Sequence, residues 1–362
     1  MTRPLHRITA ALTCGLLVGA CSSGDDGDGA ESAASPADEA AAPATPADVE
    51  PRPSAGCGAG AVAAGEEKVT ITSGGVERWY LRHVPPAHNG STPMPLVVDL
   101  HGYGEGAEVH AMVSGLGSYG DQQGFVTVTP HGQGEGPVPF WDTTPGGPDR
   151  VFVEAMLDEV EASLCVDTGR VFVTGLSNGA MMTSTLACEL SDRFAAAAPV
   201  AGVTAVEDCQ ADTPVPVVAF HGTDDGFLSY DGGFGPQVAS LPSPDGKGTL
   251  GDMADQPAAP AEPTGPSVPE VVADWADRNG CDDAAPEEAA VADDVTVLSF
   301  ACPVGAEAEL YRVEGGGHSW PGSELLANVE TIVGHTTMSI SANEVMWEFF
   351  GQHPLVTSGS KS

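Results

Sequence analysis

Basic residues are scarce in this sequence. Lysine and arginine together number 13, against 51 aspartate and glutamate residues, so the formal net charge is −38. A protein that binds nucleic acid needs a basic surface to neutralise phosphates, and docking on anionic lipid headgroups requires the same. The composition argues against both classes, and we interpret the acidic excess as a source of solubility in an external medium.

Long apolar runs are missing beyond the first residues. Arg3 and Arg7 precede the run ITAALTCGLLVGA, which is too short to span a bilayer and predicts a secretory signal over residues 1–21. The run ends in VGAC, and small residues before Cys21 predict a lipobox, in which cleavage precedes the cysteine and its sulfur receives a lipid. The alternative is ordinary signal cleavage and free secretion. We therefore expect an exported protein that is either secreted or held to a membrane only through Cys21.

Large apolar side chains are almost absent from residues 22–56, which consist mainly of Ala, Ser, Pro, Gly and acidic residues. Such a segment cannot bury enough apolar surface to offset the entropy of ordering, so it predicts a disordered linker. We expect one folded domain over 57–355 and a flexible tail over 356–362.

Metal-binding cysteine spacings are also missing. Of eight cysteines, Cys14 leaves with the signal and Cys21 would be lipidated. The other six contain no Cys-x-x-Cys pair, so we expect no metal site. An even number of cysteines in an exported chain predicts disulfides. Cys281 with Cys302 is the best single pair, because they flank one local segment. Elimination then pairs Cys188 with Cys209 and Cys57 with Cys165.

Apolar strands and amphipathic segments alternate from about residue 66. Residues 76–84 alternate as a strand with one solvated face does. Near-continuous apolar runs, typical of parallel strands buried on both faces, cover 95–100, 125–130, 170–175, 195–202 and 216–222. Residues 150–164, 178–190 and 270–279 predict helices, and Ser341 with Glu344 predicts a capping box that opens a last helix. The alternation predicts one α/β domain with a mostly parallel sheet and helices on both faces.

Residues 231–269 interrupt this pattern. They are crowded with Pro, Gly and Asp and hold few apolar side chains. We interpret them as an irregular surface insertion, with a lid over a cleft as the sharper alternative.

One serine stands at a strand-to-helix corner, in the segment Gly175-Leu-Ser177-Asn-Gly179. The segment fits Gly-x-Ser-x-Gly, the nucleophile elbow, with the strand-like RVFVT before it and the helix-like AMMTSTLACEL after it. The two glycines would let the strand and the helix close around the serine without Cβ clashes. The backbone N–H of Asn178 would then point at a developing oxyanion from the helix N-terminus.

A second oxyanion donor is expected from the loop after an early strand. Residues 97–106, VVDLHGYGEG, run from a buried strand into a glycine-rich loop that can place the N–H of Tyr103 opposite that of Asn178. A plain glycine turn is the alternative.

A serine nucleophile needs a base, and the base needs an orienting acid. In this fold they follow in the order Ser, Asp/Glu, His, each just past a strand. PVVAFHGTDDG runs into a loop with Asp224 and Asp225, and LYRVEGGGHSWPG runs into a glycine-rich loop with His318. His221 is expected to support the acid loop through hydrogen bonds. Turn-forming aspartates and an exposed loop histidine are the alternatives.

In combination, five segments resemble the extracellular polyhydroxybutyrate depolymerase-like esterases, a family with feruloyl-esterase-like and acetylxylan-esterase-like members. They are VVDLHGYG, RVFVTGLSNGAMM, LACELSDRFAAAAPVAG, PVVAFHGTDD and GGGHSWPG. The likeness covers about residues 56–355. It implies an α/β-hydrolase fold and a serine carboxylic-ester hydrolase that uses no cofactor; we expect a monomer.

The resemblance also implies roles for individual residues. Ser177 would be the nucleophile and His318 the general base and then acid. Asp225 would be the orienting acid, because it occupies the Asp position of the family motif His-Gly-Thr-x-Asp. Asp224, at the variable position of that motif, is the alternative. Trp320 resembles a position near the acyl or ring pocket, and Trp141 is expected to line the same cleft. Core packing is the alternative for both tryptophans.

The sequence departs from the family where substrate would bind. GFLSY and then residues 231–269 replace a short Pro-and-Val turn, so substrate size stays open. No polymer-binding module follows the last expected helix, which favours soluble or short esters. A peptidase on the same fold and a catalytically inactive binding lipoprotein are the rival interpretations.

Overall fold

The computed structural model describes residues 49–355, except 134–135, 207–208, 210, 212 and 254–263. The predicted signal, the lipobox, most of the linker and the tail over 356–362 lie outside the described residues. The chain divides into two units, Met1–Ala42 and Pro43–Ser362, and the described residues belong to the second. No helix in the described ranges has the length and apolar content that crossing a bilayer requires.

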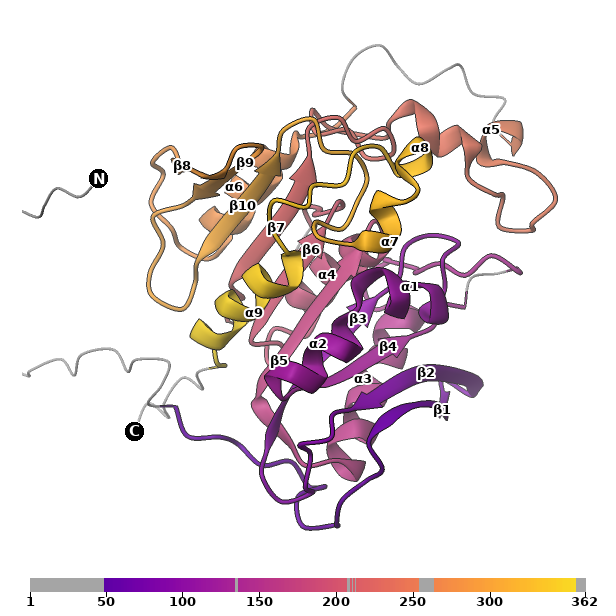
Figure 1. Cartoon of the computed structure of the whole chain (residues 1–362), viewed down its shortest axis with the longest axis vertical. Coiled ribbons are helices and arrows are strands. Elements are labelled where there is room, and N and C mark those ends of the chain that lie inside the picture. The colour runs from indigo at the N-terminus through magenta and orange to yellow at the C-terminus, as the bar shows by residue number, and fades with distance from the viewer. Residues whose placement is uncertain are drawn as a thin grey trace, which may run out of the picture. The chain divides into compact units, whose positions relative to one another are not determined.

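A single twisted sheet forms the centre of the described unit (Figure 1). Its strands are β1 (Gly65–Ser73), β2 (Val76–Val84), β3 (Met94–Leu100), β4 (Val126–Pro130), β5 (Val166–Leu176), β6 (Ala196–Val200), β7 (Val217–Gly222), β8 (Glu287–Ala292), β9 (Val295–Ser299) and β10 (Ala308–Val313). They lie in the order β1-β2-β4-β3-β5-β6-β7-β10-β9-β8. The run from β4 to β10 is parallel, and antiparallel strands complete both edges. The predicted mostly parallel α/β sheet is confirmed.

Helices cover both faces of this sheet. They are α1 (Ala107–Ser114), α2 (Leu116–Gln123), α3 (Pro148–Ser163), α4 (Asn178–Glu189), α5 (Leu250–Met253), α6 (Val268–Arg278), α7 (Glu324–Ala327), α8 (Glu330–Val333) and α9 (Ala342–Gln352), with a short 3₁₀ turn, η2 (Pro236–Ser240). Buried side chains of α3, α4 and α6 form one apolar cluster, and those of α1, α2 and α9 form another. Figure 1 shows α1, α2 and α9 in front of the strands.

The central strand β5 is apolar at nearly every position because both faces of the sheet are covered there. Val171 and Val173 belong to the cluster under α3, α4 and α6, whereas Phe172 and Leu176 belong to the opposite cluster. Successive side chains of a strand point to opposite faces, so a strand covered on both sides needs apolar residues in both sets. Continuous apolar sequence therefore located the parallel strands correctly.

Several elements were not predicted, each for a local reason. The edge strand β8 is exposed along almost its whole length, so it lacks an alternation of buried and exposed residues. Helices α1 and α2 are short, and both end at glycines with left-handed backbone, Gly115 at φ 62° and Gly124 at φ 82°. At α9, Ser341 Oγ accepts from the Glu344 N–H as predicted, and a full capping box also opens α6 at Ser267 and Glu270.

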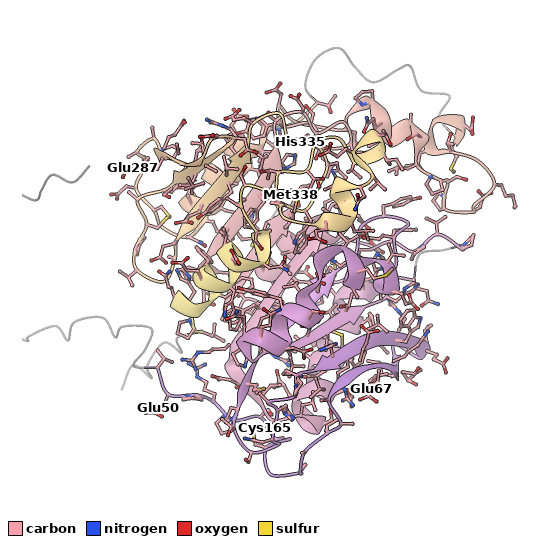
Figure 2. All side chains as sticks on the ribbon, viewed as in Figure 1. Glu50, Glu67, Cys165, Glu287, His335 and Met338 are labelled. Carbon is pink, nitrogen blue, oxygen red and sulfur yellow. A yellow bond between two sulfur atoms is a disulfide. The ribbon has the colours of Figure 1, made fainter. Side chains whose placement is uncertain are left out.

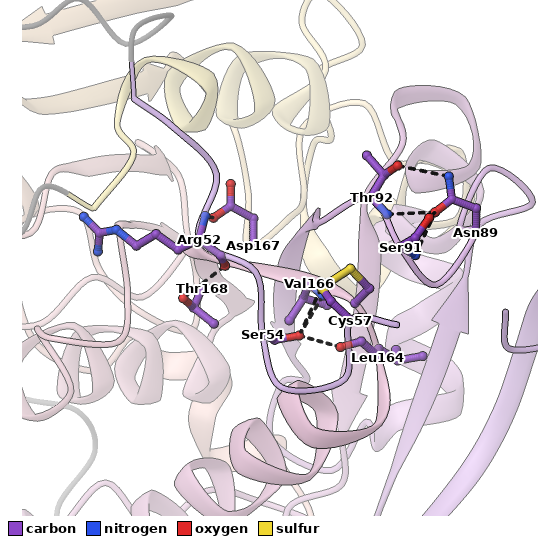
Figure 3. Close-up of a disulfide and its surroundings, with 11 residues drawn as sticks. Arg52, Ser54, Cys57, Asn89, Ser91, Thr92, Leu164, Val166, Asp167 and Thr168 are labelled. Atoms are coloured by element: carbon purple, nitrogen blue, oxygen red, sulfur yellow. Dashed lines mark hydrogen bonds between the residues drawn. A yellow bond between two sulfur atoms is a disulfide. The ribbon is translucent and has the colours of Figure 1, made fainter. Parts of the chain in front are cut away.

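Three disulfides join the six cysteines in the predicted pairs, Cys57–Cys165, Cys188–Cys209 and Cys281–Cys302. The first fastens the segment before β1 to the start of β5 (Figure 3). Beside it, Ser54 Oγ donates to the Leu164 carbonyl at 2.6 Å and accepts from the Val166 N–H at 3.1 Å. Cys165 lies at the lower end of the view in Figure 2, and the loop with His335 lies at the upper end. This cross-link therefore stabilises the end of the sheet opposite the loops that follow β7 and β10.

Replacing both Cys57 and Cys165 by Ser should lower the free energy of unfolding by about 2–5 kcal/mol, because the cross-link restricts a long stretch of unfolded chain. The two cysteines are 108 residues apart, whereas Cys281 and Cys302 are 21 apart. The matched double variant at 281 and 302 should therefore lose about 1.5 kcal/mol less, since the entropic term grows with the logarithm of loop length. Guanidinium unfolding monitored by tryptophan fluorescence measures both. Wild-type stability in the Cys57/Cys165 variant would contradict this account.

Candidate active site

Ser177 occupies a strained corner between β5 and α4. Its backbone lies at φ 58° and ψ −119°, and it is one of two non-glycine residues with positive φ in the described ranges. Such backbone is rare for a side-chain-bearing residue and marks functional sites when the surrounding structure enforces it. Here the Ser177 N–H donates to the Val200 carbonyl at 2.9 Å, and the Met181 N–H donates to the Ser177 carbonyl at 3.0 Å. Strand, turn and helix therefore have the arrangement that the elbow sequence predicts.

The two glycines of the elbow are required by close packing. A Cβ on Gly179 would lie 2.2 Å from the Leu100 carbonyl oxygen, and one on Gly175 would lie 2.7 Å from Leu100 Cβ. Any larger residue would push α4 away from the end of β3. The expectation that glycine allows strand and helix to close around the serine is confirmed.

Asp225 and His318 form a hydrogen-bonded pair, although 93 residues separate them. His318 Nδ1 lies 2.7 Å from Asp225 Oδ2, and both side chains are buried. They lie on loops that follow β7 and β10, which are parallel neighbours in the sheet. Asp225 Oδ1 accepts from the N–H groups of Phe227 and Leu228 at 2.8 and 2.9 Å. The Nδ1–H of His318 thus donates to the carboxylate, which leaves Nε2 as the nitrogen that can act as a base.

Of the two candidate acids, Asp225 is the one that contacts His318. Asp224 is exposed, and its backbone N–H donates to the Gly316 carbonyl at 2.9 Å. Burial alone would raise the pKa of Asp225, but the charge of His318 and hydrogen bonds from His221 and His318 outweigh it and hold that pKa well below its usual range. Asp225 is therefore ionised at neutral pH and can stabilise a charged imidazole.

The three glycines before His318 allow backbone segments to approach closely. A Cβ on Gly317 would lie 2.2 Å from the Val333 carbonyl oxygen. The Gly317 N–H donates to the His335 carbonyl at 2.8 Å, and the His318 N–H donates to the Val333 carbonyl at 2.6 Å. The segment over 333–335 thus fixes the backbone that carries the imidazole.

The loop after β3 lies against the serine. An ideal Cβ on Gly102 would be 3.6 Å from Ser177 Cβ. Among the described residues, no protein acceptor receives the backbone N–H of Tyr103 or of Asn178. Two free N–H groups beside one serine are what an oxyanion hole requires, and their assignment to that role stays a prediction.

His101 orients this loop, a role that the sequence did not predict. Its Nε2 accepts from the Gly132 N–H at 2.8 Å, so its Nδ1–H donates to the Gly102 carbonyl at 2.7 Å. Burial lowers the pKa of His101 to about 3, which keeps the ring neutral and preserves this pattern. In a trans peptide the N–H points opposite to the C=O, so fixing the Gly102 carbonyl also fixes the direction of the Tyr103 N–H.

The two tryptophans lie behind the site and not in an open cleft. Trp141 is 2% exposed and Trp320 is 1% exposed. The Trp141 indole N–H donates to the His101 carbonyl at 2.8 Å, and the Trp320 indole N–H donates to Asn343 Oδ1 at 3.0 Å. Core packing, the alternative interpretation, describes both residues, and the predicted substrate contacts are corrected accordingly. Trp141 instead supports the loop that carries Tyr103.

A cavity of about 180 Å³ has Gly202 and His221 in its wall, which contact Ser177 and Asp225 respectively. Apolar side chains line most of it: Met181, Val203, Leu228, Phe234, Val268 and Val271. Gly202, also in its wall, packs on the serine, because a Cβ there would lie 2.5 Å from the Ser177 carbonyl oxygen. Phe234 belongs to the irregular segment 231–269, so that segment borders the cavity, and whether it moves as a lid stays a prediction.

His221 supports the acid loop, as the sequence led us to expect. Its Nε2 lies 2.9 Å from the Leu228 carbonyl and 3.4 Å from Asp225 Oδ2. The ring therefore ties both ends of the turn that holds the acid, and it also lines the cavity.

Comparison with known proteins agrees with this geometry. A sequence model of the prolyl oligopeptidase family, Peptidase_S9, matches residues 149–226, which include Ser177 and Asp225. A bifunctional acetylxylan esterase/xylanase of Neocallimastix patriciarum is 32% identical over 148 residues, which are 41% of this chain and 22% of that protein. Feruloyl esterase D of Neurospora crassa is 30% identical over 190 residues, which are 49% of this chain and 63% of that protein. The chain thus spans less than two thirds of the length of either relative.

Among solved structures, an acetyl xylan esterase from Aspergillus awamori superposes with a TM-score of 0.54 at 18% identity, covering 79% of this chain and 99% of that one. This likeness establishes the fold. The chain has the α/β-hydrolase fold. Its sequence is similar to acetylxylan and feruloyl esterases, as the motifs predicted, whereas the link to polyhydroxybutyrate depolymerases stays a prediction.

Replacing Asp225 by Asn should lower kcat for a p-nitrophenyl ester by about 10²–10⁴-fold, because the neutral amide no longer stabilises a charged imidazole or fixes its tautomer. Asp224→Asn is the matched control one residue away, and it should keep kcat within about threefold. Steady-state kinetics on both variants measures the difference. A larger loss in the Asp224 variant than in the Asp225 variant would contradict the assignment.

Proposed function

We propose that the protein is an exported serine carboxylic-ester hydrolase. The observation that carries the proposal is the hydrogen-bonded Asp225–His318 pair, on loops after neighbouring parallel strands. A serine at positive φ follows β5, which belongs to the same run of parallel strands. Disulfides form in oxidising compartments, and three of them support export. The lipid anchor at Cys21 is part of the proposal and rests on the sequence alone.

The reaction would proceed in two halves through an acyl-enzyme. Ser177 Oγ attacks the ester carbonyl carbon while His318 Nε2 accepts its proton, and Asp225 stabilises the resulting imidazolium. The backbone N–H groups of Tyr103 and Asn178 donate to the oxyanion. The alcohol leaves with the proton from His318, and water then repeats the sequence on the acyl-enzyme to release the acid.

The substrate would be an ester with a small or aromatic acyl group, of the acetyl, feruloyl or hydroxyalkanoate type. The names of the related esterases support the first two types. The apolar lining and limited volume of the cavity beside Ser177 suit such groups better than a large polar acyl chain.

A peptidase is the second candidate, because the family model that matches residues 149–226 describes prolyl oligopeptidases. That match covers the serine and the acid, which esterases and peptidases of this fold share, and stops before His318. A catalytically inactive binding lipoprotein, the third interpretation, would have no need to keep a strained serine.

Ser177→Ala should leave a folded protein without measurable turnover of p-nitrophenyl acetate, since no other hydroxyl stands at the elbow. The wild type should react covalently with a fluorophosphonate probe, and the variant should not. Circular dichroism of the variant controls for folding. Retained turnover in the folded variant would refute the nucleophile, and an unreactive wild type would favour a binding protein.

An acyl panel separates the remaining enzyme classes. We expect kcat/KM for methyl ferulate, acetylated xylan, hydroxybutyrate oligomers or short p-nitrophenyl esters to exceed that for matched peptide p-nitroanilides by about 10³-fold or more. An amide carbonyl is less electrophilic than an ester carbonyl, and its amine leaving group depends more strongly on protonation. Chromatography of the released acids measures the natural esters. Faster cleavage of prolyl amides than of every ester would establish the peptidase.

A further inference from the structure

A second group of buried ionisable side chains lies behind the loop that carries Tyr103. His110, on α1, lies between two carboxylates: its Nε2 is 2.7 Å from Asp99 Oδ1, and its Nδ1 is 3.1 Å from Glu105 Oε2. His110 and Asp99 are fully buried, and Glu105 is 13% exposed. The mechanism of ester cleavage uses none of these three residues directly, and we call them the loop-support cluster.

The cluster carries charge. Burial alone lowers the pKa of His110, but Asp99 and Glu105 outweigh it and raise that pKa to about 10. Burial likewise favours the neutral form of Glu105, but the charge of His110 holds the pKa of this carboxyl below its usual value. Both ring nitrogens of His110 therefore donate, and Glu105 remains an anion.

The anion has one further partner, and this partner belongs to the predicted oxyanion loop. Glu105 Oε2 accepts from the Gly102 N–H at 2.7 Å. The carbonyl of the same glycine accepts from His101 Nδ1 at 2.7 Å and from the Glu105 N–H at 3.2 Å. Both polar groups of Gly102 are thus held, and the peptide that follows can present the Tyr103 N–H in only one direction.

The support continues from this loop to the centre of the sheet. Asp99 lies near the end of β3, and its second oxygen accepts from Ser114 Oγ at 2.6 Å. An edge of the Trp320 ring also packs on the His110 ring, with the ring centres 5.7 Å apart. The chain of contacts therefore runs from a rigid central strand through His110 and Glu105 to the backbone that carries the donor.

We propose that Glu105, held by His110 and Asp99, is a positioning residue for the reaction, which keeps the Tyr103 N–H aimed at the oxyanion. The inference rests on the proposed esterase function. Oxyanion donors lower the barrier because they are oriented before charge develops, so a loop free to rotate would lose most of their benefit. A buried ion cluster is not by itself a gain in stability, since apolar residues often replace one without loss. Orientation of the loop accounts for why this cluster is charged.

The test compares Glu105→Ala and Glu105→Gln with the wild type in hydrolysis of p-nitrophenyl acetate. The Ala variant should lose about 10–100-fold in kcat with KM changed less than about threefold, because a misaimed donor weakens the transition state and not substrate binding. The Gln variant should lose only about threefold to tenfold, because its amide oxygen can still accept from the Gly102 N–H although it carries no charge.

Inhibition by a trifluoromethyl ketone gives a second readout. Ser177 Oγ adds to the ketone carbon, its proton passes to His318, and the carbonyl electron pair becomes an oxyanion in the hole. The inhibition constant should therefore rise by the same factor as kcat falls, whereas inhibition by the acid product should stay unchanged.

Asp167→Ala is the matched control. Asp167 is a buried carboxylate that pairs with Arg170 at 2.5 Å and accepts from the N–H groups of Arg52 and Gly169 at 2.8 and 2.9 Å. It lies at the start of β5, whereas Ser177 follows the end of that strand. This variant should lose melting temperature while its kcat stays within about twofold of the wild type, as expected for a carboxylate with a structural role only.

The kinetics of the Glu105 variants either support the proposal or overturn it. A Glu105→Ala variant with kcat within twofold of the wild type, or with a raised KM and an unchanged kcat, would overturn it. Should the Ala variant not fold, the Gln variant decides: a lower kcat at constant KM supports the proposal, and a wild-type kcat overturns it. If the wild type hydrolyses esters and Ser177→Ala does not, a negative result at Glu105 leaves the proposed function standing.

Discussion

The parallel pairing of β7 with β10 is the constraint on which the site depends. Parallel strands bring their carboxyl ends to one edge of a sheet, so an aspartate after β7 and a histidine after β10 become neighbours although the sequence places them 93 residues apart. Ser177 follows β5, which runs parallel to β7 two positions away in the sheet, so it lies at the same edge. No local interaction would assemble these three side chains, and the sheet therefore has to form before any chemistry is possible.

Polar groups buried at this edge are used to hold backbone in place. Asp225 fixes its own turn through two N–H groups, His221 ties that turn to Leu228, and His101 fixes the Gly102 carbonyl. A buried polar group that loses its partner is costly, so these hydrogen bonds leave the groups that make them little freedom to move. The candidate catalytic side chains thus lie on loops whose conformations are fixed by hydrogen bonds. Glycines in this region let the backbone segments approach closely.

The sequence predicted much of this arrangement, because strong local signals marked it. Apolar runs located the parallel strands, and the positions of Asp225 and His318 after two strands predicted the pair that the structure brings into hydrogen-bonding contact. Helices α1 and α2 were not predicted because both are short and the sequence of α2 is polar. The roles of His101, Glu105 and His110 could not be predicted, since each depends on which backbone or side-chain groups a folded loop presents. The tryptophans were assigned from resemblance alone, and their burial depends on packing that no motif encodes.

The central claim is that Ser177 becomes acylated with His318 as its base. Rapid mixing of the enzyme with a slowly hydrolysed ester, acid quenching and peptide mass spectrometry test it most directly. The account predicts a near-stoichiometric acyl group on the peptide that contains Ser177, and its absence when His318 is replaced by Ala. Acylation of a different residue, or turnover with no acylated peptide under conditions that make deacylation slow, would contradict it.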